Sequence, residues 1–233
     1  TSPLQLDLGD FDSVARCADA ILKLRSPIDI LVCNAGYRGG GDERQLINGV
    51  EKHFVINHLG HFILFNRLLA RLYVSWQGRV VTVASRAAYR DAPAEGILFD
   101  DLAMSRNYSD ARAYGHSKLA NVLFSLKLAE LLRGTRMTSN SLHPGVIATE
   151  LSRNLNALSR FAWNAYVAVA GKTAEEGAAT TCYVATAASR EVQVHLGDGR
   201  LQFTARRPWG ADRRAAANRH AVNEPPMAVF ARA

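Results

Sequence analysis

The sequence has few cysteines and no hydrophobic run long enough to cross a bilayer. Its three cysteines, Cys17, Cys33 and Cys182, are odd in number and far apart. This predicts structural thiols in a reducing compartment and excludes a disulfide-stapled scaffold. The most apolar stretch, residues 161–171, is shorter than the ~20 residues that a membrane-spanning helix needs. We therefore expect no membrane span in these residues, and a cytoplasmic location.

Two further classes of function lack support. The seven histidines have no partners at metal-ligand spacing, so no metal site is predicted. The net charge of +7 is typical of some nucleic-acid-binding proteins, but from Gly197 onward seven Arg stand against three acidic residues, which gives 7 − 3 = +4. More than half of the excess charge thus belongs to the last part of the chain, and no nucleic-acid partner is predicted. A basic binding arm is the alternative for this segment.

The chain has the size and hydrophobicity of one domain. With 233 residues and 48% hydrophobic side chains, it can bury a substantial core. No linker or internal repeat divides residues 1–196. Residues 197–233 lack a clean apolar period, and we expect a basic, weakly ordered tail there.

Short apolar segments alternate with helix-like segments. Strands are expected near Leu4–Asp7, Ile28–Cys33, Arg79–Ala84 and Thr138–His143. Helices are expected between them, the first starting after Asp10 as its N-cap. This alternation predicts an α/β fold with a parallel sheet between helices, and ligands at the carboxyl ends of the strands.

The segment AYGHSKLANVLF places a phenol and an ammonium one helical turn apart. Tyr114 and Lys118 are four residues apart, so they share a helix face. A nearby cation favours the phenolate and lowers the pKa of a tyrosine from its usual value of ~10. We expect Tyr114 to exchange protons near neutral pH as a general acid and base.

Other blocks accompany this pair in a fixed order. DILVCNAG is a buried strand followed by Asn-Ala-Gly, FVINHLGHF follows it, GRVVTVASR ends in a serine, and SLHPGVIATEL is broken by Pro-Gly. Each block alone has a simpler interpretation: Ser85 in a turn, Asn34 in a left-handed position, Tyr114 as an ordinary phenol. Together they resemble a classical short-chain dehydrogenase/reductase, most similar to the retinol-dehydrogenase-like branch, over roughly Leu4–Ala188.

The resemblance implies a role for each matching residue. Tyr114 would be the acid and base, Lys118 would adjust the pKa of Tyr114 and bind a ribose of the cofactor, and Ser85 would contact the carbonyl oxygen of the substrate. Asn57 would complete the family's set of four catalytic residues and act through a water. The cofactor-binding residues implied in this way are Asp7, Leu8, Asn34, Ala35, Gly36, Tyr114, Lys118, Pro144, Gly145, Val146, Ile147 and Thr149.

The chain departs from the family at its start. Thr1–Leu8 already matches the third strand of the family, and no Gly-rich turn for the cofactor pyrophosphate precedes it. Gly39, Gly40 and Gly41 lack the required spacing and are expected to form a loop. Strands 1 and 2 would normally separate strand 3 from strand 4, so strand 4 should lose its neighbour and expose an edge. A fragment, a shortened gene product and a degenerate relative all remain as interpretations.

The resemblance implies an NAD(P)-dependent oxidoreductase that interconverts an alcohol and its ketone or aldehyde. Apolar side chains in Leu151–Lys172, the expected substrate wall, favour an apolar substrate such as a retinoid, steroid, aldehyde or polyketide. NADP is the expected cofactor, with NAD as the alternative. Relatives pair through the helices that hold Asn57 and Tyr114, which implies a homodimer, and some carry an N-terminal membrane anchor. The rival interpretation is a noncatalytic interaction module.

Overall fold

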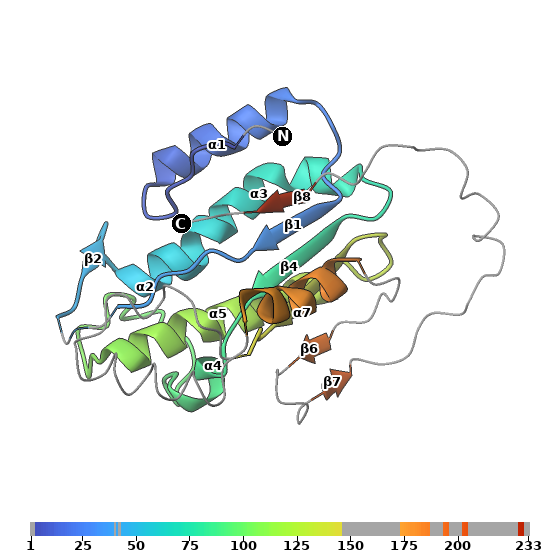
Figure 1. Cartoon of the computed structure of the whole chain (residues 1–233). Helices are drawn as coiled ribbons and strands as arrows, with labels where there is room; N and C mark the ends of the chain where they lie inside the picture. Colours follow the sequence, from blue (N-terminus) through green and yellow to red (C-terminus); the bar gives the residue numbers. More distant parts are fainter. Residues whose placement is uncertain are drawn as a thin grey trace.

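A six-stranded sheet forms the centre of the molecule (Figure 1). The computed structural model describes residues 3–39, 41, 43–145, 173–186, 193–195, 202–204 and 228–230. In spatial order the strands are β7 (Gln202–Thr204), β6 (Gln193–His195), β5 (Thr138–Leu142), β4 (Arg79–Val83), β1 (Ile30–Cys33) and β8 (Ala228–Phe230). All neighbours are parallel except β6 and β7, which are antiparallel.

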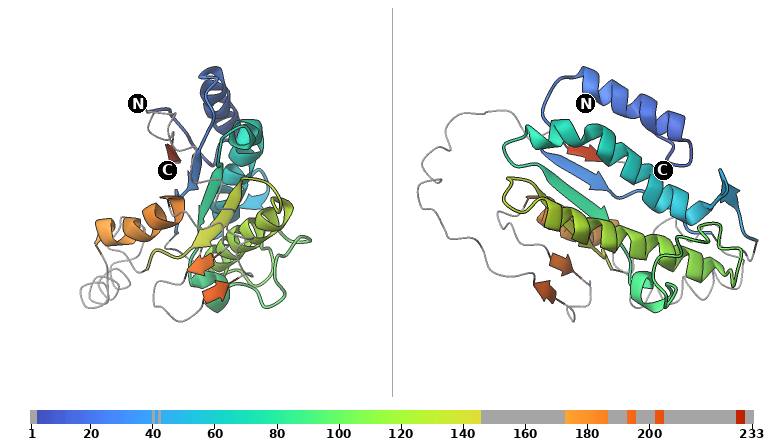
Figure 2. Two further views of the ribbon diagram at one scale, coloured as in Figure 1. Left: turned by 90° about the vertical axis from the view of Figure 1, so that its right-hand side faces the viewer. Right: turned by 180° about the vertical axis from the view of Figure 1, so that it is seen from behind.

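Helices cover both faces of this sheet. Helices α1 (Phe11–Lys23), α3 (Gly60–Tyr73) and α5 (Asp110–Leu131) lie on one face, and α7 (Ala174–Thr186) lies on the other (Figure 2). This confirms the predicted three-layer α/β architecture. In the described part of the chain, none of the helices has both the length and the hydrophobicity that crossing a membrane requires.

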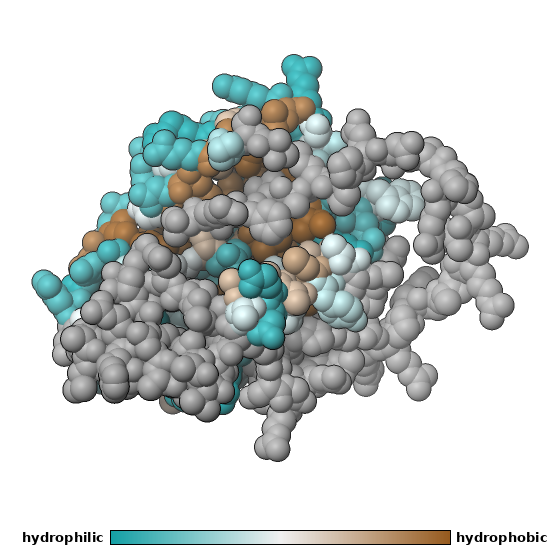
Figure 3. All heavy atoms as spheres, in the orientation of Figure 1, coloured by the Kyte–Doolittle hydropathy of each residue, from teal (hydrophilic) through white to brown (hydrophobic). Residues whose placement is uncertain are grey.

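The central strands are buried on both sides, as the covering helices require. Leu31 and Cys33 of β1 pack into the larger core under α1 and α3, whereas Ile30 and Val32 face the smaller cluster under α7. Successive residues of a strand point to opposite faces, so a strand between two helical layers must be apolar throughout. Seen from the side of α7, further hydrophobic side chains gather between α1 and α7 (Figure 3).

Side-chain caps mark the starts of two of the main helices. Asp10 caps α1 by accepting a hydrogen bond from the Asp12 N–H, as predicted. Ser109 caps α5 by accepting from the Arg112 N–H, so this helix begins four residues before Tyr114. Both caps satisfy backbone donors that a helix start otherwise leaves without a partner.

A short hairpin leads into the helix that carries Asn57. Strands β2 (Leu46–Ile47) and β3 (Val50–Glu51) are antiparallel, and the Asn48-Gly49 turn has positive φ at both residues. This is the turn type that Asn-Gly favours in hairpins. The chain continues through α2 (Lys52–Phe54) and the π-helix η1 (Val55–Leu59) directly into α3. Single π-turns of this kind often occur at functional sites.

The first predicted strand is wrong. Residues 3–7 are irregular, and Leu4 is exposed. A strand forms only where another strand pairs with it through backbone hydrogen bonds, and no described strand pairs with this segment. It is fixed instead by Leu8, which is buried against Gly60 of α3: a Cβ at residue 60 would lie 2.5 Å from the Leu8 carbonyl oxygen.

The expected exposed edge at β1 is also wrong. β8 pairs with β1 in parallel, in the register Ile30↔Ala228, Leu31↔Val229 and Val32↔Phe230. The segment that covers this edge therefore comes from the end of the chain instead of from the family's first strands. β7 and β8 both belong to residues 197–233, while the division of the chain at residue 196 stays a prediction.

Candidate active site

Tyr114 and Lys118 lie close together near the start of α5. Both are buried, with 7% and 4% of their surface exposed, and the Lys118 Nζ lies 5.7 Å from the centroid of the Tyr114 ring. Gly115 between them allows α5 to approach the short helix α4 (Ala87–Arg90), because a Cβ there would lie 2.8 Å from the Ala87 carbonyl oxygen. The helical spacing thus brings the two groups together as predicted.

The end of β4 holds this part of α5. The Val83 carbonyl oxygen accepts hydrogen bonds from Lys118 Nζ at 3.1 Å and from Asn121 Nδ2 at 3.3 Å. Two residues later, the Ser85 hydroxyl acts on the Tyr114 phenol and lowers its pKa. The Ser85 oxygen also accepts from the Ala87 N–H at 3.3 Å. β4 therefore brings Ser85 and Lys118 to the same tyrosine.

Asn57 connects the loop after β1 to α5. Its Oδ1 accepts from the Tyr37 N–H at 2.7 Å, and its Nδ2 donates to the Tyr37 carbonyl at 3.0 Å and to Ser117 Oγ at 2.9 Å. The Asn57 carbonyl oxygen lies 3.1 Å from Nδ1 of His61. The described side-chain contacts of Asn57 thus position two elements of the site, whereas its role through a water stays a prediction.

Burial dominates the proton affinities of the pair. It raises the pKa of Tyr114 above its ordinary value, while the hydrogen bond from Ser85 and the charge of Arg38 act in the opposite direction. Burial also lowers the pKa of Lys118 to about 8. The sequence predicts that Lys118 lowers the pKa of Tyr114, whereas in the structure the net shift of the phenol is upward and Arg38 is the cation that opposes it.

The residues implied for cofactor binding have different surroundings. At the end of β1, Asn34 is exposed, Ala35 is buried and Gly36 lies beside Lys118: a Cβ at residue 36 would lie 3.6 Å from Lys118 Nζ. The absence of a side chain leaves space next to this ammonium group. Lys118 has three N–H donors, and among the described residues Val83 accepts one of them.

The remaining residues of this group lie before α1 and after β5. Asp7 is exposed and accepts from the Gly9 N–H at 2.8 Å, while Leu8 is buried. Pro144 and Gly145 follow β5, and Gly145 has a φ of 97°. Val146, Ile147, Thr149 and the expected substrate wall Leu151–Lys172 lie outside the described residues.

The loop with the three glycines is part of the protein scaffold. The Gly39 N–H donates to His53 Nε2 at 2.9 Å, so this donor already has an internal partner. This agrees with its interpretation as a loop instead of a phosphate-binding turn. The described residues around Lys118 and Gly36 thus fit the ribose end of a nicotinamide cofactor, whereas no described loop matches the pattern for its pyrophosphate.

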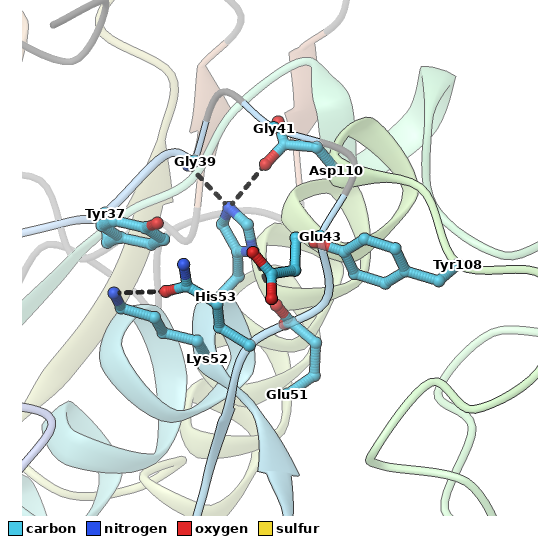
Figure 4. Close-up of a pocket in the computed structure, with 10 residues that line it drawn as sticks. Tyr37, Gly39, Gly41, Glu43, Glu51, Lys52, His53, Tyr108 and Asp110 are labelled. Carbon is cyan, nitrogen blue, oxygen red and sulfur yellow. Dashed lines mark hydrogen bonds and ion pairs between the residues drawn. The ribbon is translucent and has the colours of Figure 1, made fainter. Parts of the chain in front are cut away.

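A polar cavity next to this loop escaped the sequence analysis (Figure 4). Its volume is about 250 Å³, and its buried floor is a pair of His53 and Glu51, whose Nδ1 and Oε1 atoms are 2.7 Å apart. Because His53 Nε2 accepts from Gly39, its Nδ1 carries the proton that is donated to Glu51. Asp110 Oδ1 lies 3.4 Å from the same Nε2. The Asn48-Gly49 hairpin signal could have placed Glu51 and His53 at a helix start.

Arg38 is a further residue that the sequence analysis missed. Its guanidinium carbon lies 4.8 Å from the centroid of the Tyr114 ring. The residue directly follows Gly36 and Tyr37, so its position next to the Asn-Ala-Gly block was the available signal.

Comparisons with known proteins agree with this geometry. The model of the short chain dehydrogenase family matches residues 1–97, which include Asn34, Asn57 and Ser85. The chain is 40% identical over 196 residues to the chloroplastic short-chain dehydrogenase TIC 32 A of Brassica napus, covering 78% of this chain and 58% of that protein. It is 41% identical over 187 residues to human retinol dehydrogenase 12, covering 80% and 57%. The chain thus spans less than two thirds of the length of these curated relatives.

Solved structures have the same fold. A crystal structure of an uncharacterized protein from Mycobacterium Paratuberculosis is 34% identical with a TM-score of 0.62, covering 91% of this chain and 68% of that one. A blue fluorescent protein from a metagenomic library, solved in complex with NADPH, has a TM-score of 0.62 at 22% identity, covering 82% and 72%. The order of the sequence blocks, the fold and these relatives agree: the chain belongs to the short-chain dehydrogenase/reductase family and resembles its retinol-dehydrogenase-like branch.

Proposed function

We propose that the protein is an NAD(P)-dependent oxidoreductase that interconverts an apolar alcohol and its ketone or aldehyde. The observation that carries this proposal is the buried phenol of Tyr114, whose ring centroid lies 5.7 Å from the Lys118 ammonium and whose pKa is lowered by the neighbouring Ser85 hydroxyl. A phenol with such neighbours suits a reaction in which a proton moves on or off a substrate oxygen. The resemblance to retinol dehydrogenases supplies the class of reaction.

Tyr114 acts as the acid in reduction and as the base in oxidation. As negative charge grows on the substrate oxygen, hydrogen bonds from Tyr114 and Ser85 stabilise it, and they are strongest in the transition state. Because both residues are held on elements packed around β4, they need little rearrangement during the reaction. Lys118 adds positive charge to the same buried region.

A nicotinamide cofactor supplies or accepts the hydride. Lys118 and the Asn34–Gly36 segment are the described residues that would hold its ribose, with Asp7 and Leu8 near the adenine by resemblance. NADP is preferred by resemblance to this branch, and NAD is the alternative. The same resemblance supports a homodimer through the helices that carry Asn57 and Tyr114. A cytoplasmic location is proposed from the three widely spaced cysteines, with membrane association through an N-terminal segment as the alternative.

Replacing Tyr114 with Phe tests the proposal. Tyr114→Phe removes the hydroxyl and keeps the ring, so kcat with an apolar alcohol and NADP should fall at least about 100-fold, the lower range for general acid–base catalysis. Cofactor affinity should change little. The matched control is Tyr183→Phe, because Tyr183 lies on α7 and is largely exposed. Equal kcat in the wild type and Tyr114→Phe would refute the assignment.

A noncatalytic interaction module is the second candidate. It is favoured by the Gly39 N–H, which bonds to His53 and so does not serve as a phosphate ligand. Titrating NADPH and NADH into the full chain, with protein fluorescence as the signal, separates the two functions. Saturable binding supports the oxidoreductase, and no binding up to millimolar cofactor supports the interaction module.

A further inference from the structure

Arg38 places a guanidinium over the face of the phenol that we assign as the acid and base. Its central carbon lies 4.8 Å from the Tyr114 ring centroid, closer than the 5.7 Å of Lys118 Nζ. A cation within about 6 Å of an aromatic face is attracted to its electron density. The attraction becomes stronger when the ring carries the negative charge of a phenolate.

The loop that carries Arg38 is fixed on both sides. Asn57 holds the backbone N–H and carbonyl of Tyr37, at 2.7 and 3.0 Å. His53 accepts from the Gly39 N–H at 2.9 Å, and its ring packs against that of Tyr37 with centroids 5.0 Å apart. Arg38 lies between these two fixed residues, so the backbone from which its side chain reaches the Tyr114 ring is held by the fold.

The other charged and titratable groups around Tyr114 leave Arg38 with a distinct role. The Ser85 hydroxyl lowers the pKa of the phenol, and Asp91 raises it but is itself paired with Arg90 at 2.8 Å. His53 meets the Tyr114 ring edge-on at 6.1 Å and is bracketed by the carboxylates of Glu51 and Asp110.

Arg38 and Lys118 differ in how their charge depends on pH. Burial lowers the pKa of Lys118 to about 8, so this residue loses its charge in mildly alkaline solution. A guanidinium stays protonated throughout this range. In the pH range in which a tyrosine approaches ionisation, Arg38 is therefore the lasting positive charge at the ring.

We propose that Arg38 is a positioning residue for the reaction: its guanidinium, held over the ring by the loop after β1, stabilises the phenolate form of Tyr114. This role in turnover rests on the proposed function, whereas the effect on Tyr114 itself does not require turnover.

The ionisation of Tyr114 can be measured directly in the full chain. Uniform labelling with 3-fluorotyrosine, whose phenol is more acidic than that of tyrosine, allows the titration to be followed by ¹⁹F NMR while the protein stays folded. The Tyr114 resonance is the one that Tyr114→Phe removes. In Arg38→Met this resonance should titrate at a pH about one unit higher than in the wild type, which corresponds to about tenfold less phenolate at a given pH.

Two further variants separate charge from shape. Arg38→Lys keeps the positive charge and should titrate close to the wild type, whereas Arg38→Gln should shift like Arg38→Met. This pair also decides the question if Arg38→Met does not fold. Arg133→Met, in the exposed turn after α5, is the control and should leave the Tyr114 titration unchanged.

The outcomes distinguish this inference from the proposed function. If Arg38→Gln shifts the titration by less than about 0.3 units while remaining folded, the inference is wrong. If the wild type turns over an alcohol, the pH profile of kcat/KM should move in the same direction as the ¹⁹F titration in Arg38→Gln and not in Arg38→Lys. If no alcohol or carbonyl is converted but the titration shifts, the proposed function fails and the electrostatic role of Arg38 stands.

Discussion

β4 and β5 are joined by five register pairs, from Arg79↔Thr138 to Val83↔Leu142, whereas β1 and β8 are joined by three. The central strands are buried on both faces and follow one another along the chain with a helix between them. The outer pair at β8 joins segments almost 200 residues apart in sequence. The centre of the sheet is thus formed by units that follow one another along the chain, whereas the edge at β8 depends on one pairing between segments far apart in sequence.

The candidate active site belongs to the centre. Ser85 follows β4, Lys118 hydrogen bonds to the last residue of β4, and the loop with Arg38 follows β1. None of the described contacts of these residues involves β8. We therefore expect mutations in the centre to damage stability and the site together, and changes at β8 to affect association more than the site.

Truncating the core under α1 and α3 should have the largest effect on stability. Leu31 of β1 is completely buried in the larger core cluster. Leu31→Ala removes buried apolar contacts and leaves a cavity, so it should lower the free energy of unfolding by about 2–5 kcal/mol. Urea unfolding followed by circular dichroism measures this change.

The control for Leu31→Ala keeps the same chemical change at the surface. Leu24, after the end of α1, has 60% of its surface exposed. Leu24→Ala should change the free energy of unfolding by less than about 0.5 kcal/mol. Similar losses for both variants would mean that the central layer is not the stabilising core.

The buried charge of Lys118 makes the stability of the centre depend on pH. Its pKa is lowered from 10.5 to about 8, so between these values the unfolded chain binds more protons than the folded one. The contribution to stability therefore rises with pH across this window, by about 3 kcal/mol. In Lys118→Met this dependence disappears. The free energy of unfolding of the variant minus that of the wild type should therefore be about 3 kcal/mol larger at pH 7 than at pH 10.5.

Only the difference between two proteins isolates this effect, because Tyr114 also titrates at high pH in both. Lys127→Met is the matched control, since Lys127 lies on the same helix and is exposed. Its stability should follow the wild type at every pH. Parallel pH profiles for the wild type and Lys118→Met would show that Lys118 keeps its ordinary pKa in the folded protein.

How much of the fold follows from sequence depends on how local the signal is. The patterns ILVC and RVVTV predict buried strands, and the cap Asp10 marks a helix start, because each signal lies within a few residues. The strand at Leu4–Asp7 was wrong because pairing depends on a partner elsewhere in the chain. The pairing of β8 with β1 has no local signature for the same reason.

The site shows the same division. Tyr114 and Lys118 are four residues apart, so helix geometry alone predicts their proximity. The loop that carries Arg38 is held by hydrogen bonds from its backbone to Asn57 and His53, which lie outside this loop. The approach of Arg38 to Tyr114 therefore depends on contacts between separate parts of the chain. The direction of the Tyr114 pKa also follows from burial, which no spacing in the sequence reveals.

Removing β8 should have the smallest effect on stability and still change the behaviour of the protein. Deleting residues 228–233 removes three register pairs, whose hydrogen bonds contribute about 0.5–1.5 kcal/mol each, and also removes the entropy cost of ordering those residues. The two terms nearly cancel, so the free energy of unfolding should change by about 1 kcal/mol or less.

The same deletion makes the edge of β1 available to other chains, and association measured by sedimentation velocity should increase. Val229→Pro keeps the chain length but removes a backbone donor, so it should increase association in the same way. If deleting residues 228–233 lowers the free energy of unfolding as much as Leu31→Ala does, β8 is part of the cooperative core. An edge strand stabilises the protein that strongly only when it folds together with the central strands.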